Sequence, residues 1–284
     1  MPLQGLAIIG ESINDSVPST HLLFEANDLA GIIRLAKAQA DLGAAYIDVN
    51  IGLRSPAFMA EMVRSVQTVT DKPLSIDSPD FAIAKAGLEA YDLTCGTPIL
   101  NSISPLRLPM FDLLKVKPFR PILLVSETLK DGVGMACCTA EETYAAAQLL
   151  LETAHRHGLA NTDCIFDPGI APIGTDTEGN LHRLMGALTL IHDDPAFAGV
   201  HVSVGLSNFT VMLPSKRADG SPVKTPLANA FLTRAMPLGL DMVIGSVKQA
   251  YTWLPEGHPA LQCFDNCLAA QGFDALVCVL DFYS

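Results

Sequence analysis

Eight short apolar runs recur along the chain, and each ends in an acid, an amide or a hydroxyl. Some runs, such as LAII and ILLV, are apolar at every position, which is typical of strands buried on both faces of a sheet. The polar ends of the eight runs are Glu11 with Ser12, Asp48 with Asn50, Asp77, Asn101, Ser126, Asp167, Asn208 and Ser246. Polar groups that end parallel strands gather at one mouth of a barrel, where such barrels build their sites.

Segments with the spacing of amphipathic helices separate these runs. Residues 140–157 follow Thr139, and Glu142 stands three positions after it, which is the capping-box pattern. Three prolines leave room for only a short helix near 106–117, and 209–224 is the longest irregular stretch. The other expected helices span residues 27–42, 56–69, 79–90, 178–193, 225–238 and 259–271.

Strands that alternate with helices predict a parallel sheet. Eight such units favour an α/β fold of the (β/α)8 TIM-barrel type, with an open doubly wound sheet as the alternative. No GxGxxG follows the first strand, which weakens the dinucleotide-binding reading of that alternative. A barrel takes about 250 residues, so the 284 residues predict a single domain over 1–284.

Composition narrows the class of protein. With 49% apolar and 17% charged residues the chain can bury a large core, and its net charge of −12 argues against a nucleic-acid partner. No apolar run approaches the roughly 20 residues of a membrane helix. The absence of a basic leader and the seven scattered cysteines predict a reducing cytoplasm.

Five strand ends carry the candidate chemistry: Asp48, Asp77, Asn101, Asp167 and Asn208. No nucleophile stands beside a base, and no Lys suggests a Schiff base. A ring of carboxylates and amides suits a neutral heterocycle rich in N–H donors, because a carboxylate can accept two parallel hydrogen bonds. Each Asp or Asn taken alone could equally be a helix cap or a turn former.

Metal ligation is weakly indicated, and no protein-bound metal is expected. Cys137 and Cys138 are adjacent, which is a poor spacing for one tetrahedral zinc. His155 and His157 suit the carboxyl end of a helix, where a positive charge is favourable.

Six motifs follow one another along the chain: IIGESIN at 8–14, IDVNIG at 47–52, SIDSP at 75–79, ILNSIS at 99–104, FDPG at 166–169 and VGLSN at 204–208. On these motifs the chain resembles the pterin-binding barrel of methyltetrahydrofolate–corrinoid methyltransferases. This group includes the folate module of cobalamin-dependent methionine synthase and is distantly related to dihydropteroate synthase. The likeness runs from about residue 5 to about residue 250, and its specificity comes from the number, order and spacing of the motifs.

The resemblance implies a role for each matched residue. Tetrahydrofolate or methyltetrahydrofolate would be the substrate, with Asn208 beside nitrogen 5 as the catalytic residue and Gly205 letting the backbone approach the ring. Lys216 and Arg217 are candidates for the folate tail, or are solvated loop charges. The remaining pterin-binding candidates are Glu11, Asn14, Asp48, Asn50, Asp77, Asn101 and Asp167.

The chain also departs from related patterns. Phe209 to Met212 follow Asn208 where corrinoid methyltransferases often carry a Gln. The first loop INDSVPST and the last strand end IGSVKQ lack the diphosphate-site motifs of dihydropteroate synthase, which argues against a synthase-like enzyme.

No Asp-x-His-x-x-Gly motif is present. The resemblance therefore implies that a separate protein carries the corrinoid (cobalamin) and docks over the mouth. It also implies a homodimer, to which the terminal segment FDALVCVLDFY could contribute, although that segment could also pack on its own barrel. A non-catalytic folate-binding barrel and a metal-dependent lyase are the remaining alternatives.

Overall fold

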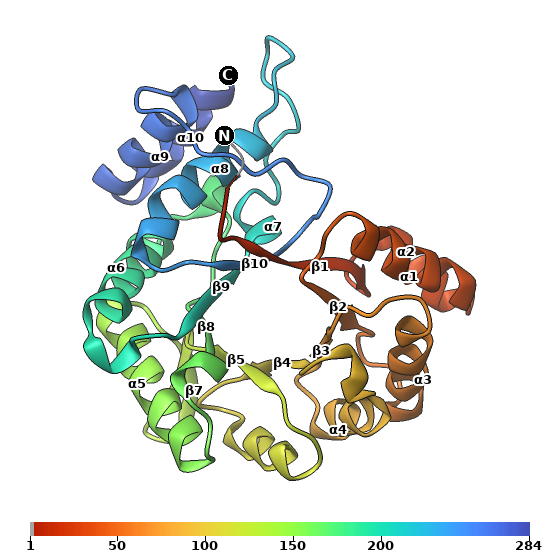
Figure 1. The fold of residues 1–284 in the computed structure, drawn as a ribbon. Helices are drawn as coiled ribbons and strands as arrows, with labels where there is room; N and C mark the ends of the chain where they lie inside the picture. The colour runs from red at the N-terminus through yellow and green to blue at the C-terminus, as the bar shows by residue number, and fades with distance from the viewer. Residues whose placement is uncertain (1–2) are drawn as a thin grey trace.

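A computed structural model describes residues 3–284, so the first two residues of the expected domain lie outside the described range. Eight parallel strands close into a barrel (Figure 1). The prediction of a (β/α)8 barrel is confirmed, and the open sheet is excluded because β1 pairs with both β2 and β10. Around the ring the strands are β1 (Ala7–Asn14), β10 (Met242–Gly245), β9 (His201–Gly205), β8 (Ile165–Asp167), β5 (Arg120–Leu124), β4 (Ile99–Ile103), β3 (Leu74–Asp77) and β2 (Tyr46–Asn50).

Helices surround the ring and bury their apolar faces on its outside (Figure 1). Each of the helices expected from the sequence is present, and the 106–117 segment is a 3-10 helix over Leu108–Lys115. The helices are α1 (Pro18–Glu25), α2 (Leu29–Asp41), α3 (Pro56–Gln67), α4 (Phe81–Ala90), α5 (Ala140–Arg156), α6 (Asn180–Asp193), α7 (Leu206–Phe209), α8 (Lys224–Ala235), α9 (Pro259–Ala269) and α10 (Phe273–Tyr283).

The structure adds local detail to the sequence prediction. The first connection holds two helices because Pro18 starts α1 and the Asp28 side chain caps α2 through the Gly31 N–H. The segment 209–224 begins at the last residue of the short helix α7. The terminal segment is the helix α10, which packs against α9.

A hairpin between β5 and α5 is a further feature that the sequence analysis does not predict. Strands β6 (Glu127–Lys130) and β7 (Val133–Ala136) pair antiparallel. Asp131 and Gly132, both with positive φ, connect them as a two-residue turn of the kind that Asp-Gly favours. Arg107 forms an ion pair with Glu127 at 3.2 Å, which ties the hairpin to the connection after β4.

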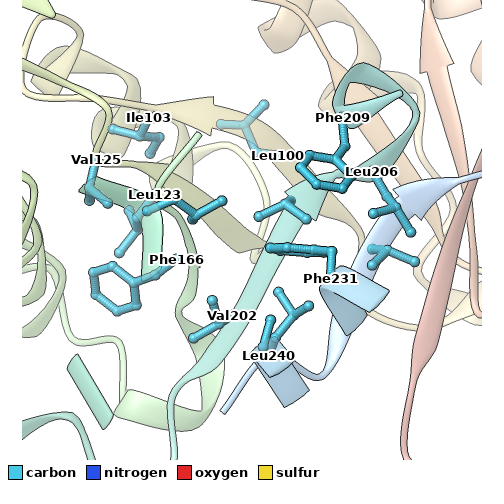
Figure 2. Close-up of a cluster of buried hydrophobic side chains, with 14 of the residues drawn as sticks. Leu100, Ile103, Leu123, Val125, Phe166, Val202, Leu206, Phe209, Phe231 and Leu240 are labelled. Carbon is cyan, nitrogen blue, oxygen red and sulfur yellow. The ribbon is translucent and has the colours of Figure 1, made fainter. Parts of the chain in front are cut away.

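The main core lies between the barrel and its helices. Figure 2 shows part of it, in which Leu206 and Phe209 of α7 lie near Phe231 of α8. The Phe209 and Phe231 ring centroids are 5.3 Å apart, and both rings also contact Phe264 of α9. Among residues 3–284, no helix combines the length and the apolar content that crossing a membrane requires.

A second, smaller apolar cluster plugs the barrel itself. It consists of Ile9, Ile99, Ile122, Ile165 and Met242, each at most 2% exposed. Because side chains of a strand alternate between its two faces, the residues two positions further along each strand also point inward. The plug therefore forms the floor below the layer in which the strand ends place their polar groups.

Candidate functional site

A cavity of about 700 Å³ opens above this floor at the carboxyl ends of the strands. Each of the eight strands contributes one ring residue that lines it, and five of those residues lie two positions after a member of the plug. In order around the barrel the ring is Glu11, Ile244, Gly205, Asp167, Leu124, Asn101, Asp77 and Asp48. Six of the sequence-predicted site residues thus belong to one ring.

A β-bulge in β1 adds Asn14 to the cavity wall. Gly10 pairs with Ile47, whereas Ile13 pairs with Val49, so β1 contains one more residue than β2 over this stretch. The extra residue reverses the alternation, so Ile13 joins the outer core while Glu11 and Asn14 both line the cavity. Glu11 and Asn14 share one site although three positions separate them in the chain.

Acidic groups occupy one arc of the ring. Asp48 is fully buried, and neither of its carboxylate oxygens has a hydrogen-bond partner among the described residues. Burial and the neighbouring Asp77 carboxyl raise the pKa of Asp48 well above its ordinary value. Burial also raises the pKa of Glu11, against the effect of a hydrogen bond from Ser207. The carboxyl groups in this arc are therefore more readily protonated than usual when the cavity contains no ligand that is positively charged or rich in hydrogen-bond donors.

Asp77 is oriented by Asn50. The Asn50 Nδ2 donates to Asp77 Oδ2 at 2.8 Å, and the Asn50 Oδ1 accepts from the Gly52 N–H. Burial raises the pKa of Asp77 to about 6, while Asn50 and the charge of Arg107 act in the opposite direction. Asn50 lies outside the residues that line the cavity, so its geometry supports a positioning role for Asp77 in place of direct contact.

Asp167 stands across the ring from this arc. Its Oδ1 accepts the Gly169 N–H at 2.8 Å, and burial raises its pKa to about 6. The Arg183 guanidinium holds the turn from behind by donating to the carbonyls of Pro168 and Gly169, at 2.6 and 2.9 Å. Asp167 therefore has one fixed oxygen and one side that faces the cavity.

Helix α7 brings Asn208 to the cavity. Leu206 and Phe209 are 2% and 1% exposed, which anchors the helix in the core, while Ser207 and Asn208 between them are exposed on the cavity side. A β-carbon on Gly205 would lie 2.9 Å from the Asn208 Nδ2. A glycine at 205 thus leaves room for the Asn208 amide above the end of β9.

The two cationic candidates lie elsewhere. Neither Lys216 nor Arg217 is among the residues that line the cavity, and the Arg217 guanidinium lies 4.7 Å from the centre of the Phe282 ring in α10. Their assignment to a folate tail remains a prediction. Ser207, which donates to Glu11 at 2.8 Å, is a site residue that sequence reasoning missed.

The cavity offers acceptors from opposite sides and apolar contacts between them. Leu124, Ile170, Val211 and Ile244 give apolar surface for the faces of a flat ring, while the carboxylates accept from its edges. Among the described lining residues there is no Lys, His or Cys. No three His, Cys, Asp or Glu side chains of residues 3–284 have a geometry that could hold a metal ion.

The family of the chain follows from these features together with its relatives. The model of the pterin binding enzyme family matches residues 13–245, which is well over half of the chain, so the protein belongs to this family. A methylcorrinoid:tetrahydrofolate methyltransferase of Eubacterium limosum is 28% identical over 251 residues, covering 84% of each chain. The resemblance drawn from the motifs is confirmed at the level of this family.

Solved structures show the same fold. The Xanthomonas albilineans dihydropteroate synthase in complex with 7,8-dihydropteroate superposes with a TM-score of 0.58 at 18% identity, covering 95% of this chain and 96% of that one. The 7,8-dihydropteroate synthase of Vibrio fischeri ES114 gives a TM-score of 0.57 at 15% identity, covering 99% and 94%. At these identities the likeness supports the barrel fold alone.

Proposed function

We propose that this chain is an enzyme that transfers a methyl group between the cobalt of a corrinoid on a separate protein and nitrogen 5 of tetrahydrofolate. The observation that carries the proposal is the ring of buried carboxylates and amides above an apolar floor. The Eubacterium limosum relative, a methylcorrinoid:tetrahydrofolate methyltransferase, supports the same reaction. The direction of transfer is left open.

In this proposal the ring binds the pterin head by its edges. Asp77, Asn101 and Asp167 accept from the amino-pyrimidinone edge, whose amino group and ring N–H are donors. Such donors replace the water that burial removes from the carboxylates and favour their ionised form. A ligand that lacks the donors leaves buried acceptors unpaired and binds more weakly.

The methyl step requires alignment of nitrogen 5 with the methyl group and uses no nucleophile from the protein. When nitrogen 5 attacks, its lone pair forms the new N–C bond, the electrons of the cobalt–carbon bond stay with cobalt, and the proton on nitrogen 5 leaves. Asn208 places an amide at the cavity, where it stabilises the charge that develops at nitrogen 5. An amide cannot act as a strong acid, so the role of Asn208 is electrostatic and geometric.

The corrinoid partner would dock over the open mouth. Leu53 after β2 and Met212 after α7 lie on loops at the carboxyl side of the strands and are 96% and 79% exposed. In this proposal these two side chains contact the corrinoid protein. The homodimer and the cytoplasmic location belong to the proposal as well. α10 presents Phe273 and Val277 to solvent as one possible dimer surface, which light scattering would test.

A spectroscopic assay tests the proposal. The protein is mixed with cob(I)alamin and methyltetrahydrofolate, and then with methylcobalamin and tetrahydrofolate, while the cobalt absorption bands are followed. We expect interconversion of the cobalt bands in at least one direction, and a loss of at least about tenfold in Asn208→Ala, which is ~1.4 kcal/mol. Asn208→Ala with undiminished turnover would remove Asn208 from the mechanism.

Three alternative functions give different results in assays of this kind. A non-catalytic folate-binding barrel binds tetrahydrofolate but leaves the cobalt bands unchanged. A dihydropteroate-synthase-like enzyme forms dihydropteroate and needs no corrinoid. Activity that survives a chelator argues against a metal-dependent lyase.

A further inference from the structure

Ser207 and Glu11 are joined across the cavity rim. The Ser207 Oγ donates to Glu11 Oε2 at 2.8 Å, although 196 positions separate the two residues. Glu11 lies in β1 and Ser207 lies in α7, directly after β9. Since β1 and β9 lie on either side of β10, the bond passes over the end of that strand. Ser207 directly precedes Asn208, the residue that is proposed to lie beside nitrogen 5 during methyl transfer.

The short helix that carries both residues has little stability of its own. A run of four residues cannot complete a normal helical ladder, so its orientation depends on contacts made with the rest of the protein. Leu206 and Phe209 supply those contacts on the core side (Figure 2). On the cavity side, a hydrogen bond from Ser207 to Glu11 holds α7.

Glu11 is a firm anchor for such a contact because the backbone beside it is held on both sides. The Ser12 N–H donates to the Gln39 Oε1 at 2.9 Å, and the Thr20 hydroxyl donates to the Ser12 carbonyl at 2.7 Å. Gln39 is 2% exposed and reaches this position because Gly10 has no side chain, since a β-carbon there would lie 2.5 Å from the Gln39 Oε1. The bulge thus presents the Glu11 carboxylate at a defined point of the rim.

We propose that the hydrogen bond between Glu11 and Ser207 is a latch that sets the position of Asn208, which makes Ser207 a positioning residue for methyl transfer. This inference rests on the proposed function for its kinetic consequence. The core contacts fix the depth of α7, and the latch fixes its rotation toward the cavity. Without the latch, the Asn208 amide samples orientations that do not face nitrogen 5, and the reacting geometry is reached less often.

A double-mutant cycle tests the latch. Ser207→Ala, Glu11→Ala and the double variant are compared with the wild type for kcat and for methyltetrahydrofolate affinity by calorimetry. We expect Ser207→Ala to lower kcat about five- to tenfold while the dissociation constant changes less than about twofold, because the edge contacts of the pterin remain. The double variant should lose no more than the more impaired single variant, because one bond is removed in all three.

Two further variants serve as controls for the cycle. Glu11→Gln keeps an oxygen that can accept the Ser207 hydroxyl, so it should retain more activity than Glu11→Ala. Ser215→Ala removes an exposed hydroxyl from the same connection outside the cavity and should match the wild type.

The latch would be overturned if the fold-losses of kcat in the two single variants multiplied in the double variant. A wild-type kcat in Ser207→Ala would also overturn it. A crystal structure of Ser207→Ala supplies a readout that does not depend on activity, since the Asn208 side chain should shift or spread over several conformers. If the wild type transfers no methyl group, the proposed function fails, while an unmoved Asn208 in that crystal structure would refute the latch alone.

Discussion

Replacing Asp167 by Asn should stabilise the unliganded protein and lower its affinity for folate. Burial raises the pKa of this carboxyl from 3.8 to about 6, so keeping it ionised in the folded state costs about 3 kcal/mol. An amide has the same shape and carries no charge. Its oxygen can still accept the Gly169 N–H, and its NH2 group can face the cavity, so no new buried donor is left unpaired.

The size of this stabilisation depends on pH. A carboxyl whose folded pKa lies above its unfolded pKa favours the folded state below about pH 4, and this advantage is lost as the pH rises through about 6. Asp167→Asn avoids that loss. At pH 7.5 its free energy of unfolding should exceed that of the wild type by up to about 3 kcal/mol, which is a rise in Tm of up to about 5 °C. At pH 4 the two proteins should be nearly equal.

Urea denaturation at the two pH values measures this difference, and Asp176→Asn is the matched control. The Asp176 carboxylate accepts the N–H groups of Asn180 and Leu181 at 2.9 and 2.7 Å at the start of α6. Although burial raises the pKa of Asp176, these bonds lower it overall, so its loss should destabilise the protein at pH 7.5. Asp167→Asn that is destabilised at pH 7.5, or that binds methyltetrahydrofolate as tightly as the wild type, would refute the reasoning. A tenfold to hundredfold loss of affinity is expected, since an acceptor of charge-assisted hydrogen bonds is removed.

Three further predictions concern the cavity and its support. Folate affinity should rise between pH 5 and 7.5, and binding should release protons, because the N–H donors of the ligand favour the ionised forms of Asp77 and Asp167. Calorimetry in buffers of different ionisation enthalpy measures this release, and its absence would contradict the raised pKa values. Gly205→Ala should lower kcat at least about tenfold with little change in Tm, since its methyl group would lie 2.9 Å from the Asn208 Nδ2; unchanged kinetics would contradict this crowding. Phe231→Ala should lower the free energy of unfolding by about 3–5 kcal/mol in urea titrations, and a loss below 1 kcal/mol would argue against its place in the core.

Much of the ring could be predicted from the sequence, and the reason is geometric. Parallel strands of similar length end at one level, so an acid or amide at each apolar run's end is brought to one mouth. Leu124 and Ile244 complete the ring but have no polar signal that distinguishes them from core residues. Asn50 carries the expected polar signal, yet its amide is used to hold Asp77 and does not line the cavity.

Other features depend on contacts that sequence spacing does not show. The hydrogen bond between Ser207 and Glu11 joins α7, which follows β9, to β1 over the end of β10, and only the closed barrel brings these elements together. The hairpin after β5 had a local signal in Asp131-Gly132, which favours a two-residue turn, but it is short and its strands are exposed. The bulge in β1 reverses the alternation of inward positions, which no simple period-two pattern predicts.

A crystal structure with methyltetrahydrofolate tests the central claim most directly. The account predicts the bicyclic head in the cavity above the isoleucine floor, with its amino-pyrimidinone edge on Asp77 and Asp167 and nitrogen 5 beside Asn208. A head bound at another surface, or an empty cavity in crystals soaked at millimolar ligand, would contradict it.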